Sequence, residues 1–141
     1  MNADLERLIA NLGLQKQVQL IGQQSRSSVA RLLHQCTLFV LASRFETFGI
    51  SALEAMAVGK AVVGTAVDGI LEILDDGETG ILVEPDDPHA LAGAISQLLA
   101  DAPLRERLGQ AARVRVKDQF QRQQMGENYT HAFQEVLAHG A

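Results

Sequence analysis

Apolar positions along this chain change several times between helical spacing and short continuous runs. Residues 3–12 carry apolar side chains three and four positions apart, which predicts a helix that Gly13 ends. Residues 25–35 show the same spacing after a group of serines, which are preferred N-cap residues. The pattern therefore predicts two helices in the first quarter of the chain.

Four short apolar runs predict strands, which cover residues 18–22, 37–42, 61–66 and 80–85. The run at 37–42 is apolar throughout, the form that a central strand buried on both faces takes. Helical spacing returns between and after these runs, at about 50–58, 69–76, 88–100, 103–120 and 121–139. Alternation of this kind predicts an α/β domain with a mainly parallel sheet and a helical C-terminal tail.

Length and composition limit the possible classes of protein. The 141 residues predict one domain, spanning 1–141. A net charge of −5 argues against nucleic acid or an anionic membrane as the main partner. One cysteine and four scattered histidines offer no metal-ligand spacing, so we expect no metal. No apolar run approaches the roughly 18 residues that span a bilayer, and no signal peptide precedes the first helix, so the predicted compartment is the cytoplasm.

The stretch "SRFETFGISALEAMAVGK", residues 43–60, carries the candidate chemistry. Its first half is the loop that leaves the run at 37–42, and ligands bind beyond the carboxyl ends of strands in open parallel sheets. Gly49 lets the backbone approach a ligand closely. The amides of Gly49, Ile50 and Ser51 open a helix and favour an anion, phosphate above all.

Two glutamates eight positions apart complete this stretch. Glu46 lies in the loop and Glu54 is expected two turns into the following helix, and each carboxylate can accept paired hydrogen bonds from a diol. A sugar nucleotide, with a diphosphate between a sugar and a ribose, fits this arrangement. Glutamates at this spacing are also often ordinary solvated side chains, and the residues alone leave that alternative open.

Residues 43–95, from "SRFETFGISALEAMAVGK" through "VDGILEIL" and "GETGILVEP" to "ALAGAI", resemble the donor-binding half of the family-4 (group 1) retaining glycosyltransferases. Those enzymes have the GT-B architecture of two Rossmann-like domains. The resemblance implies a Rossmann-like three-layer α/β/α domain with about four strands. It extends over nearly the whole chain.

The resemblance also implies roles for individual residues. Glu46 would contact the transferred sugar and is the expected catalytic residue, and Glu54 would bind the ribose. Backbone amides at 48–49 would lie against the sugar, and those at 50–51 against the diphosphate. The expected substrate-binding residues are Glu46, Thr47, Phe48, Gly49, Ile50, Ser51 and Glu54.

The chain departs from the family pattern at three positions. Ala61 and Leu71 replace common prolines, and Asp68 replaces the first glycine of a Gly-Gly pair. If the loop at Asp68 runs close to the donor phosphates, its carboxylate would weaken their binding. No residue can be matched to the acceptor domain or to the Arg/Lys pair that neutralises the diphosphate in the family.

The implied function is transfer of a sugar, with retention, from a nucleotide diphosphate sugar to an unidentified acceptor, with no metal or other cofactor. Positive charge on the protein would stabilise the leaving diphosphate. This chain is expected to be inactive alone, as part of a longer enzyme of carbohydrate biosynthesis. The alternative is a free-standing, non-catalytic nucleotide-sugar-binding or interaction module. A sugar-nucleotide epimerase of similar architecture is disfavoured by the context of the two glutamates.

Assembly is the last expectation. In a sheet of order 3-2-1-4-5-6, the runs at 18–22 and 37–42 would be the third and fourth strands, which are not neighbours. The run at 37–42 would then have a bare edge, which invites pairing. The two runs could pair directly, two chains could complete one another, or an apolar stripe of Met125, Tyr129 and Phe133 could contact a partner. We therefore expect a homodimer or larger assembly, or association with the missing acceptor domain.

Overall fold

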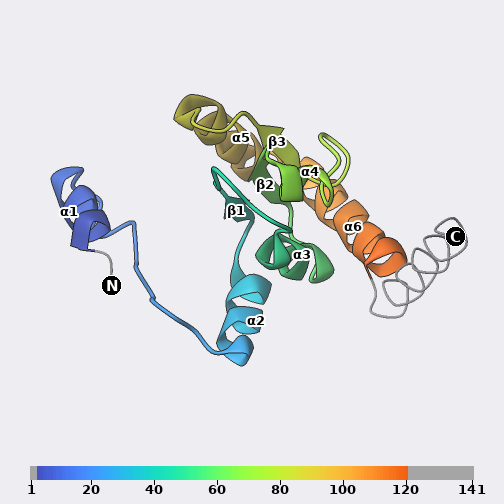
Figure 1. The fold of residues 1–141 in the computed structure, drawn as a ribbon, viewed down its shortest axis with the longest axis horizontal. Helices are drawn as coiled ribbons and strands as arrows, with labels where there is room; N and C mark the ends of the chain where they lie inside the picture. The colour runs from blue at the N-terminus through green and yellow to red at the C-terminus, as the bar shows by residue number, and fades with distance from the viewer. Residues whose placement is uncertain (1–2, 121–141) are drawn as a thin grey trace, which may run out of the picture. The chain divides into compact units, whose positions relative to one another are not determined.

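A computed structural model of the chain describes residues 3–120 (Figure 1). The chain divides into two compact units, with the division between Arg31 and Leu32. The first unit contains helix α1 (Ala3–Asn11), and the second contains the sheet and the helices that follow it. No helix among the described residues combines the length and the apolar content needed to cross a bilayer.

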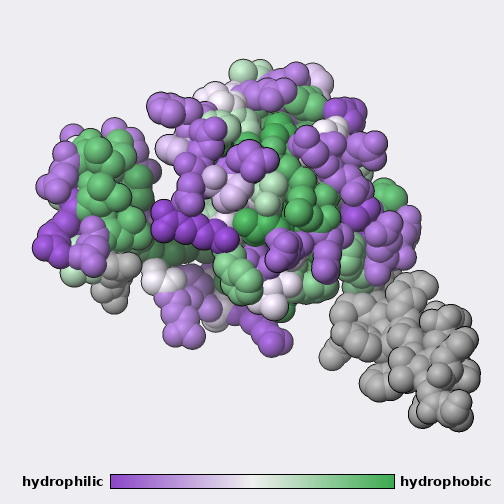
Figure 2. All heavy atoms as spheres, turned by 45° about the horizontal axis from the view of Figure 1, so that its top comes forward, coloured by the Kyte–Doolittle hydropathy of each residue, from purple (hydrophilic) through white to green (hydrophobic). Residues whose placement is uncertain are grey.

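Helix α1 ends as the sequence predicts. Gly13 adopts a φ of 68°, in the left-handed region, and the Leu14 amide donates to the Ile9 carbonyl at 2.9 Å. These are features of a glycine-terminated helix. The apolar face of α1 is exposed at Leu5, Leu8 and Leu12 (Figure 2).

Helix α2 (Arg26–Gln35) is held at both ends by side chains. At its start the Ser25 hydroxyl accepts a hydrogen bond from the Ser28 amide at 3.2 Å, which confirms the predicted serine cap. At its end the Lys60 ammonium group donates to the carbonyls of His34 and Cys36, each at 2.8 Å. A cation suits this position because the last carbonyls of a helix lack intrahelical donors.

Three parallel strands form the sheet, in the order β1 (Phe39–Leu41), β2 (Val62–Thr65) and β3 (Ile81–Val83). Val63 at the centre pairs with Val40 on one side and with Ile81 on the other. The predicted α/β class with a parallel sheet is confirmed. The described residues contain three strands, one fewer than expected.

The predicted strand at 18–22 is wrong, because these residues form no strand. An extended segment is stable only when its backbone groups pair with a neighbour. The described sheet consists of β1, β2 and β3. The apolar residues at 18–22 are typical of a strand, but they do not show whether a neighbouring strand is present to pair with it.

The predicted burial of the run at 37–42 on both faces is wrong, whereas its expected bare edge is found. The run at 37–42 contains β1, which lies at the edge of the sheet and is only half-buried. The most buried strand is β2, every residue of which is buried. Both runs are apolar, and only the order of the strands decides which of them has neighbours on both edges.

Helices cover both faces of the sheet, which confirms the three-layer arrangement (Figure 1). Helices α3 (Ile50–Ala57) and α4 (Asp68–Leu71) lie on one side, and α5 (Pro88–Ala100) lies on the other. On the side of α5 the core contains Val63, Val83, Ala94, Leu98 and Leu108. Helix α6 (Ala102–Gln119) packs against both α3 and α5 and so joins the two outer layers.

Helix α5 begins with the predicted cap. The Asp87 carboxylate accepts hydrogen bonds from the amides of His89 and Ala90 at 3.0 and 2.9 Å, and Pro88 occupies the first turn. These contacts satisfy two amides that have no intrahelical acceptor. They also fix the loop between β3 and α5.

The free edge of β1 leads to a prediction about assembly. Backbone groups on this edge have no strand partner among the described residues, and such an edge promotes pairing with another chain. We expect a homodimer or larger assembly at micromolar concentration, measured by sedimentation equilibrium. A mass equal to the 15.2 kDa monomer over that range would contradict it. The stripe of Met125, Tyr129 and Phe133 lies outside the described residues.

Candidate functional site

The loop at 43–49 leaves the carboxyl end of β1 and turns into α3 at Gly49. Gly49 is the N-cap residue, with φ 75° and ψ 42°. A Cβ atom there would lie 2.8 Å from Ile70 Cδ1 and 3.0 Å from Ile73 Cδ1. The two isoleucine side chains can shift, but the left-handed backbone strains any residue that has a Cβ atom, so the turn depends on glycine.

The start of α3 presents free backbone amides. Gly49 supplies no side-chain cap, and the amides of Gly49, Ile50 and Ser51 have no acceptor among the described residues. The positive end of the helix dipole adds to these donors. An anion such as a phosphate would satisfy them.

Glu46 is half-buried in the same loop. Its carbonyl accepts a hydrogen bond from the Gly69 amide at 3.0 Å, which fixes the backbone. Its carboxylate lies 3.5 Å from the Phe48 amide, the long limit for a hydrogen bond. The carboxylate therefore keeps most of its capacity to accept hydrogen bonds from a ligand.

Gly69 allows α4 to lie directly against this loop. A Cβ atom at Gly69 would be 2.5 Å from the Glu46 carbonyl oxygen, from the Phe48 nitrogen and from the Thr47 carbonyl carbon. All three contacts are to backbone atoms, which cannot move aside as the end of a flexible side chain can. The neighbouring Asp68 side chain is exposed. Sequence reasoning noted this Asp-Gly pair but did not find the contact that Gly69 makes.

Helix α6 supports the loop from the far end of the described chain. The rings of Phe48 and Phe120 meet edge to face, with centroids 6.3 Å apart and planes at 68°. Arg115 donates to the carbonyls of Ile73 and Glu72, which follow α4, at 2.9 and 3.1 Å. It also forms an ion pair with Asp75. Sequence reasoning missed Arg115 and Phe120, because neither lies in a motif near the loop.

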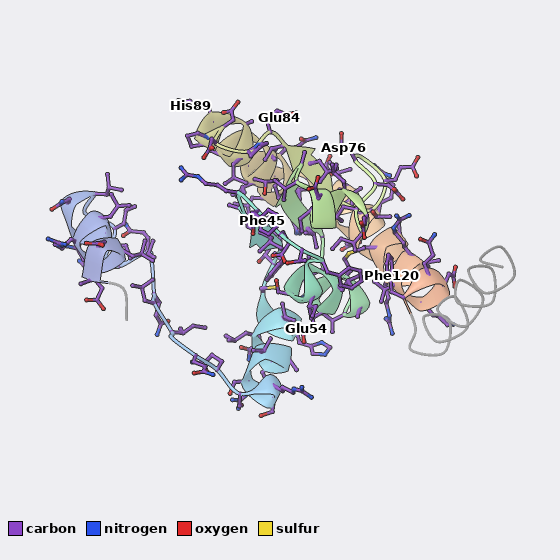
Figure 3. All side chains as sticks on the ribbon, viewed as in Figure 1. Phe45, Glu54, Asp76, Glu84, His89 and Phe120 are labelled. Carbon is purple, nitrogen blue, oxygen red and sulfur yellow. The ribbon has the colours of Figure 1, made fainter. Side chains whose placement is uncertain are left out.

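Glu54 lies one turn into α3, not two, because the helix begins at Ile50. Its side chain is exposed and has no partner among the described residues (Figure 3). Thr47 and Ser51 are also exposed. The fold therefore places the predicted residues from Glu46 to Ser51 in one turn and leaves Glu54 accessible on the helix that follows. Within residues 3–120 no hydrogen bond joins the Glu46 and Glu54 carboxylates.

Metal-ligating side chains are dispersed over the part of the chain that the structure describes. No three histidine, cysteine, aspartate or glutamate side chains within it come together as a metal site would require.

A parallel sheet covered by helices, with free helix amides at its carboxyl edge, is the arrangement of Rossmann-like α/β domains. The sequence identifies the family within that class. A family model described as "Glycosyl transferases group 1" matches residues 1–115. The chain belongs to this family.

Individual relatives agree with this assignment. The chain is 37% identical over 131 residues to N-acetyl-alpha-D-glucosaminyl L-malate synthase of Bacillus anthracis. The aligned residues make up 93% of this chain and 34% of that protein. Sucrose-phosphate synthase from Thermosynechococcus elongatus superposes with a TM-score of 0.86 at 33% identity, over 95% of this chain and 34% of that one. HepE of Anabaena, in complex with UDP and glucose, superposes with a TM-score of 0.83 at 27% identity. The superposition covers 91% of this chain and 36% of HepE.

The chain thus spans about one third of the length of these relatives and matches their C-terminal portion. The predicted resemblance to group 1 glycosyltransferases and the Rossmann-like α/β class are confirmed. The roles of individual residues stay predictions.

The contact at Gly69 can be tested by adding one methyl group. We expect Gly69→Ala to lower the free energy of unfolding by about 1–3 kcal/mol, because the loop backbone must move to admit a Cβ atom. Gly93→Ala is the matched control, because nothing lies within 4 Å of a Cβ there. In the interior of α5 that change should stabilise by about 0.5–1 kcal/mol. Urea denaturation measures both, and a Gly69→Ala protein as stable as the parent would contradict the contact.

Proposed function

We propose that this chain is the donor-binding portion of a retaining glycosyltransferase, which moves a sugar from a nucleotide diphosphate sugar to an acceptor. The observation that carries the proposal is the turn at Gly49, where free amides and the Glu46 carboxylate lie together. Membership of the family supports it. So do the complexes of HepE with UDP and with UDP-glucose, which belong to a relative of the same fold.

Each group in the turn has a proposed part in donor binding. Glu46 accepts hydrogen bonds from hydroxyls of the transferred sugar and holds the reacting centre in place. The amides at 50–51 receive the diphosphate, and the amides at 48–49 face the sugar. Glu54 binds the two hydroxyls of the ribose from α3. A Phe48 ring held by Phe120 keeps the amides of the turn in position.

We further propose that the reaction uses no metal. The diphosphate that leaves carries negative charge, which the positive end of α3 would partly stabilise. The Arg/Lys pair of the family has no counterpart that can be matched in this chain. Arg44 is the cation nearest in sequence to the turn at 46–51, and it is paired with Asp86. The remaining positive charge would therefore come from outside the matched residues.

A second candidate is a free-standing module that binds a nucleotide sugar without catalysis. The turn at 46–51, with its free amides and the Glu46 carboxylate, would support donor binding in this case too. Both candidates bind the donor in the same way. They differ in whether a longer form of the protein transfers the sugar.

The donor-binding role predicts different effects for the two glutamates. Glu54→Ala should weaken binding of free UDP by about 1.5–3 kcal/mol, because a charged acceptor for the ribose hydroxyls is lost. Glu46→Ala should leave free UDP unaffected and weaken only UDP-glucose. Isothermal titration of both ligands measures this. Glu106→Ala, which removes an exposed carboxylate on α6, is the matched control.

Two results would contradict the roles. If Glu46→Ala and Glu54→Ala weakened the binding of free UDP equally, the assignment of Glu46 to the sugar and Glu54 to the ribose would be wrong. Absence of heat with UDP, GDP, ADP and dTDP alike would remove the donor-binding proposal itself.

The 141-residue chain by itself is predicted to transfer no sugar. Positioning of two reactants supplies about 7–11 kcal/mol of barrier lowering in well-oriented cases, and no acceptor-side group of the family can be matched here. The measurement is release of nucleoside diphosphate by the purified chain, with and without candidate acceptors. Release above background that depends on an acceptor would overturn the prediction.

A further inference from the structure

A hollow lies at the carboxyl edge of the sheet, and no residue of the turn at Gly49 lines it. It is a cavity of about 480 Å³, within the range of roughly 300–1,000 Å³ of small-molecule sites. Its walls come from the loop after β1, from Thr65 at the end of β2, from the loop between β3 and α5, and from the first turn of α5. None of the lining residues belongs to the segment 46–54.

The cavity and the proposed donor site lie on different sides of the sheet. Glu84, which lines the cavity, lies beside the start of α5, whereas Glu54 lies on α3 across the sheet (Figure 3). Helix α5 packs on β2 and β3, and α3 packs on β1 and β2. A ligand in the cavity would therefore leave the turn at Gly49 unoccupied.

Hydrogen bonds fix the walls of the cavity. The Thr65 hydroxyl donates to the Ser43 carbonyl at 2.5 Å, which ties the loop after β1 to β2. Asp87 is held by the two amides at the start of α5. The backbone around the cavity is therefore ordered before any ligand arrives, which lowers the entropy cost of binding.

An ion pair between two residues of the cavity lining can open. Arg44 Nε lies 2.7 Å from Asp86 Oδ1, and the two side chains are 85% and 65% exposed. An ion pair so exposed contributes about 1 kcal/mol or less. The hydroxyls of a ligand can replace the pair, since Arg44 then donates to the ligand and Asp86 accepts from it.

The charged and apolar side chains that line the cavity indicate which kind of ligand it can bind. The lining carries one cation, Arg44, against three carboxylates, Glu84, Asp86 and Asp87. The Glu84 carboxylate has no partner among the described residues. The excess of negative charge disfavours an anion such as a diphosphate. Leu91 adds an apolar patch, against which the C–H face of a sugar ring can pack.

We infer that this cavity binds a sugar ring that is neutral or carries an amine, in a site separate from the donor site. Glu84 accepts hydrogen bonds from ring hydroxyls or from the amine, and the Arg44–Asp86 pair supplies one donor and one acceptor. The inference does not rest on the proposed donor binding, because the two sites share no residue.

The test is a titration of the full chain with three sugars of matched size, followed by backbone amide chemical shifts. The probes are D-glucose, D-glucosamine in slightly acidic buffer where its amine is protonated, and D-glucuronate. We expect saturable shifts at Ser43, Thr65 and Leu91 with glucosamine and, more weakly, with glucose. Glucuronate should bind at least tenfold more weakly than glucosamine, because its carboxylate meets the acidic lining.

Two variants assign the effect to the cavity. Glu84→Gln keeps the size of the side chain and should weaken glucosamine about tenfold and glucose less, because only the amine loses a charged partner. Glu78→Gln removes an exposed carboxylate outside the cavity and should change nothing. Equal binding of glucuronate and glucosamine, shifts confined to 46–54, or no saturable shift up to tens of millimolar sugar would each overturn the inference. Binding of UDP, measured separately, shows whether the donor site is intact in either case.

Discussion

Close backbone contact at Gly69 is the constraint on which the proposed donor site depends. The amide of Gly69 bonds to the Glu46 carbonyl, and the absence of a side chain lets α4 lie against residues 46–48. Gly49 then turns the chain into α3 with its first amides free. A methyl group at Gly69 would push the loop away from its support, and a side chain at Gly49 would strain the left-handed backbone of the turn. The arrangement of the polar groups therefore depends on two glycines.

The same kind of contact fixes the layers behind the loop. A Cβ atom at Gly109 on α6 would lie 2.2 Å from the Gly59 carbonyl oxygen, just past the end of α3. Helix α6 can approach the end of α3 this closely because Gly109 has no side chain. From there it brings Arg115 to the carbonyls after α4 and Phe120 to the ring of Phe48. Helix α6 thereby supports both segments that form the turn.

Two regions of opposite electrostatic character occupy the carboxyl edge of the sheet. On the side of α3, free amides and the helix dipole favour an anion. On the side of α5, the amides at the start of the helix are already satisfied by Asp87, and the cavity has a negative lining. Gly49 caps one helix without a side chain and Asp87 caps the other with a carboxylate. That one difference in cap residue leaves anion-binding capacity in the first case and removes it in the second.

The sequence by itself determined the local elements: the helices with their glycine, serine and aspartate signals, the α/β class, the family motif and the segment 46–54. These depend on side chains close together along the chain, and caps such as Ser25 and Asp87 form the contacts predicted for them. Only the tertiary structure decided that β2 is central, that 18–22 forms no strand, and that Gly69, Arg115 and Phe120 support the loop. Strand order and contacts between distant segments depend on which surfaces meet in space, and apolar composition is the same for an edge strand as for a central one.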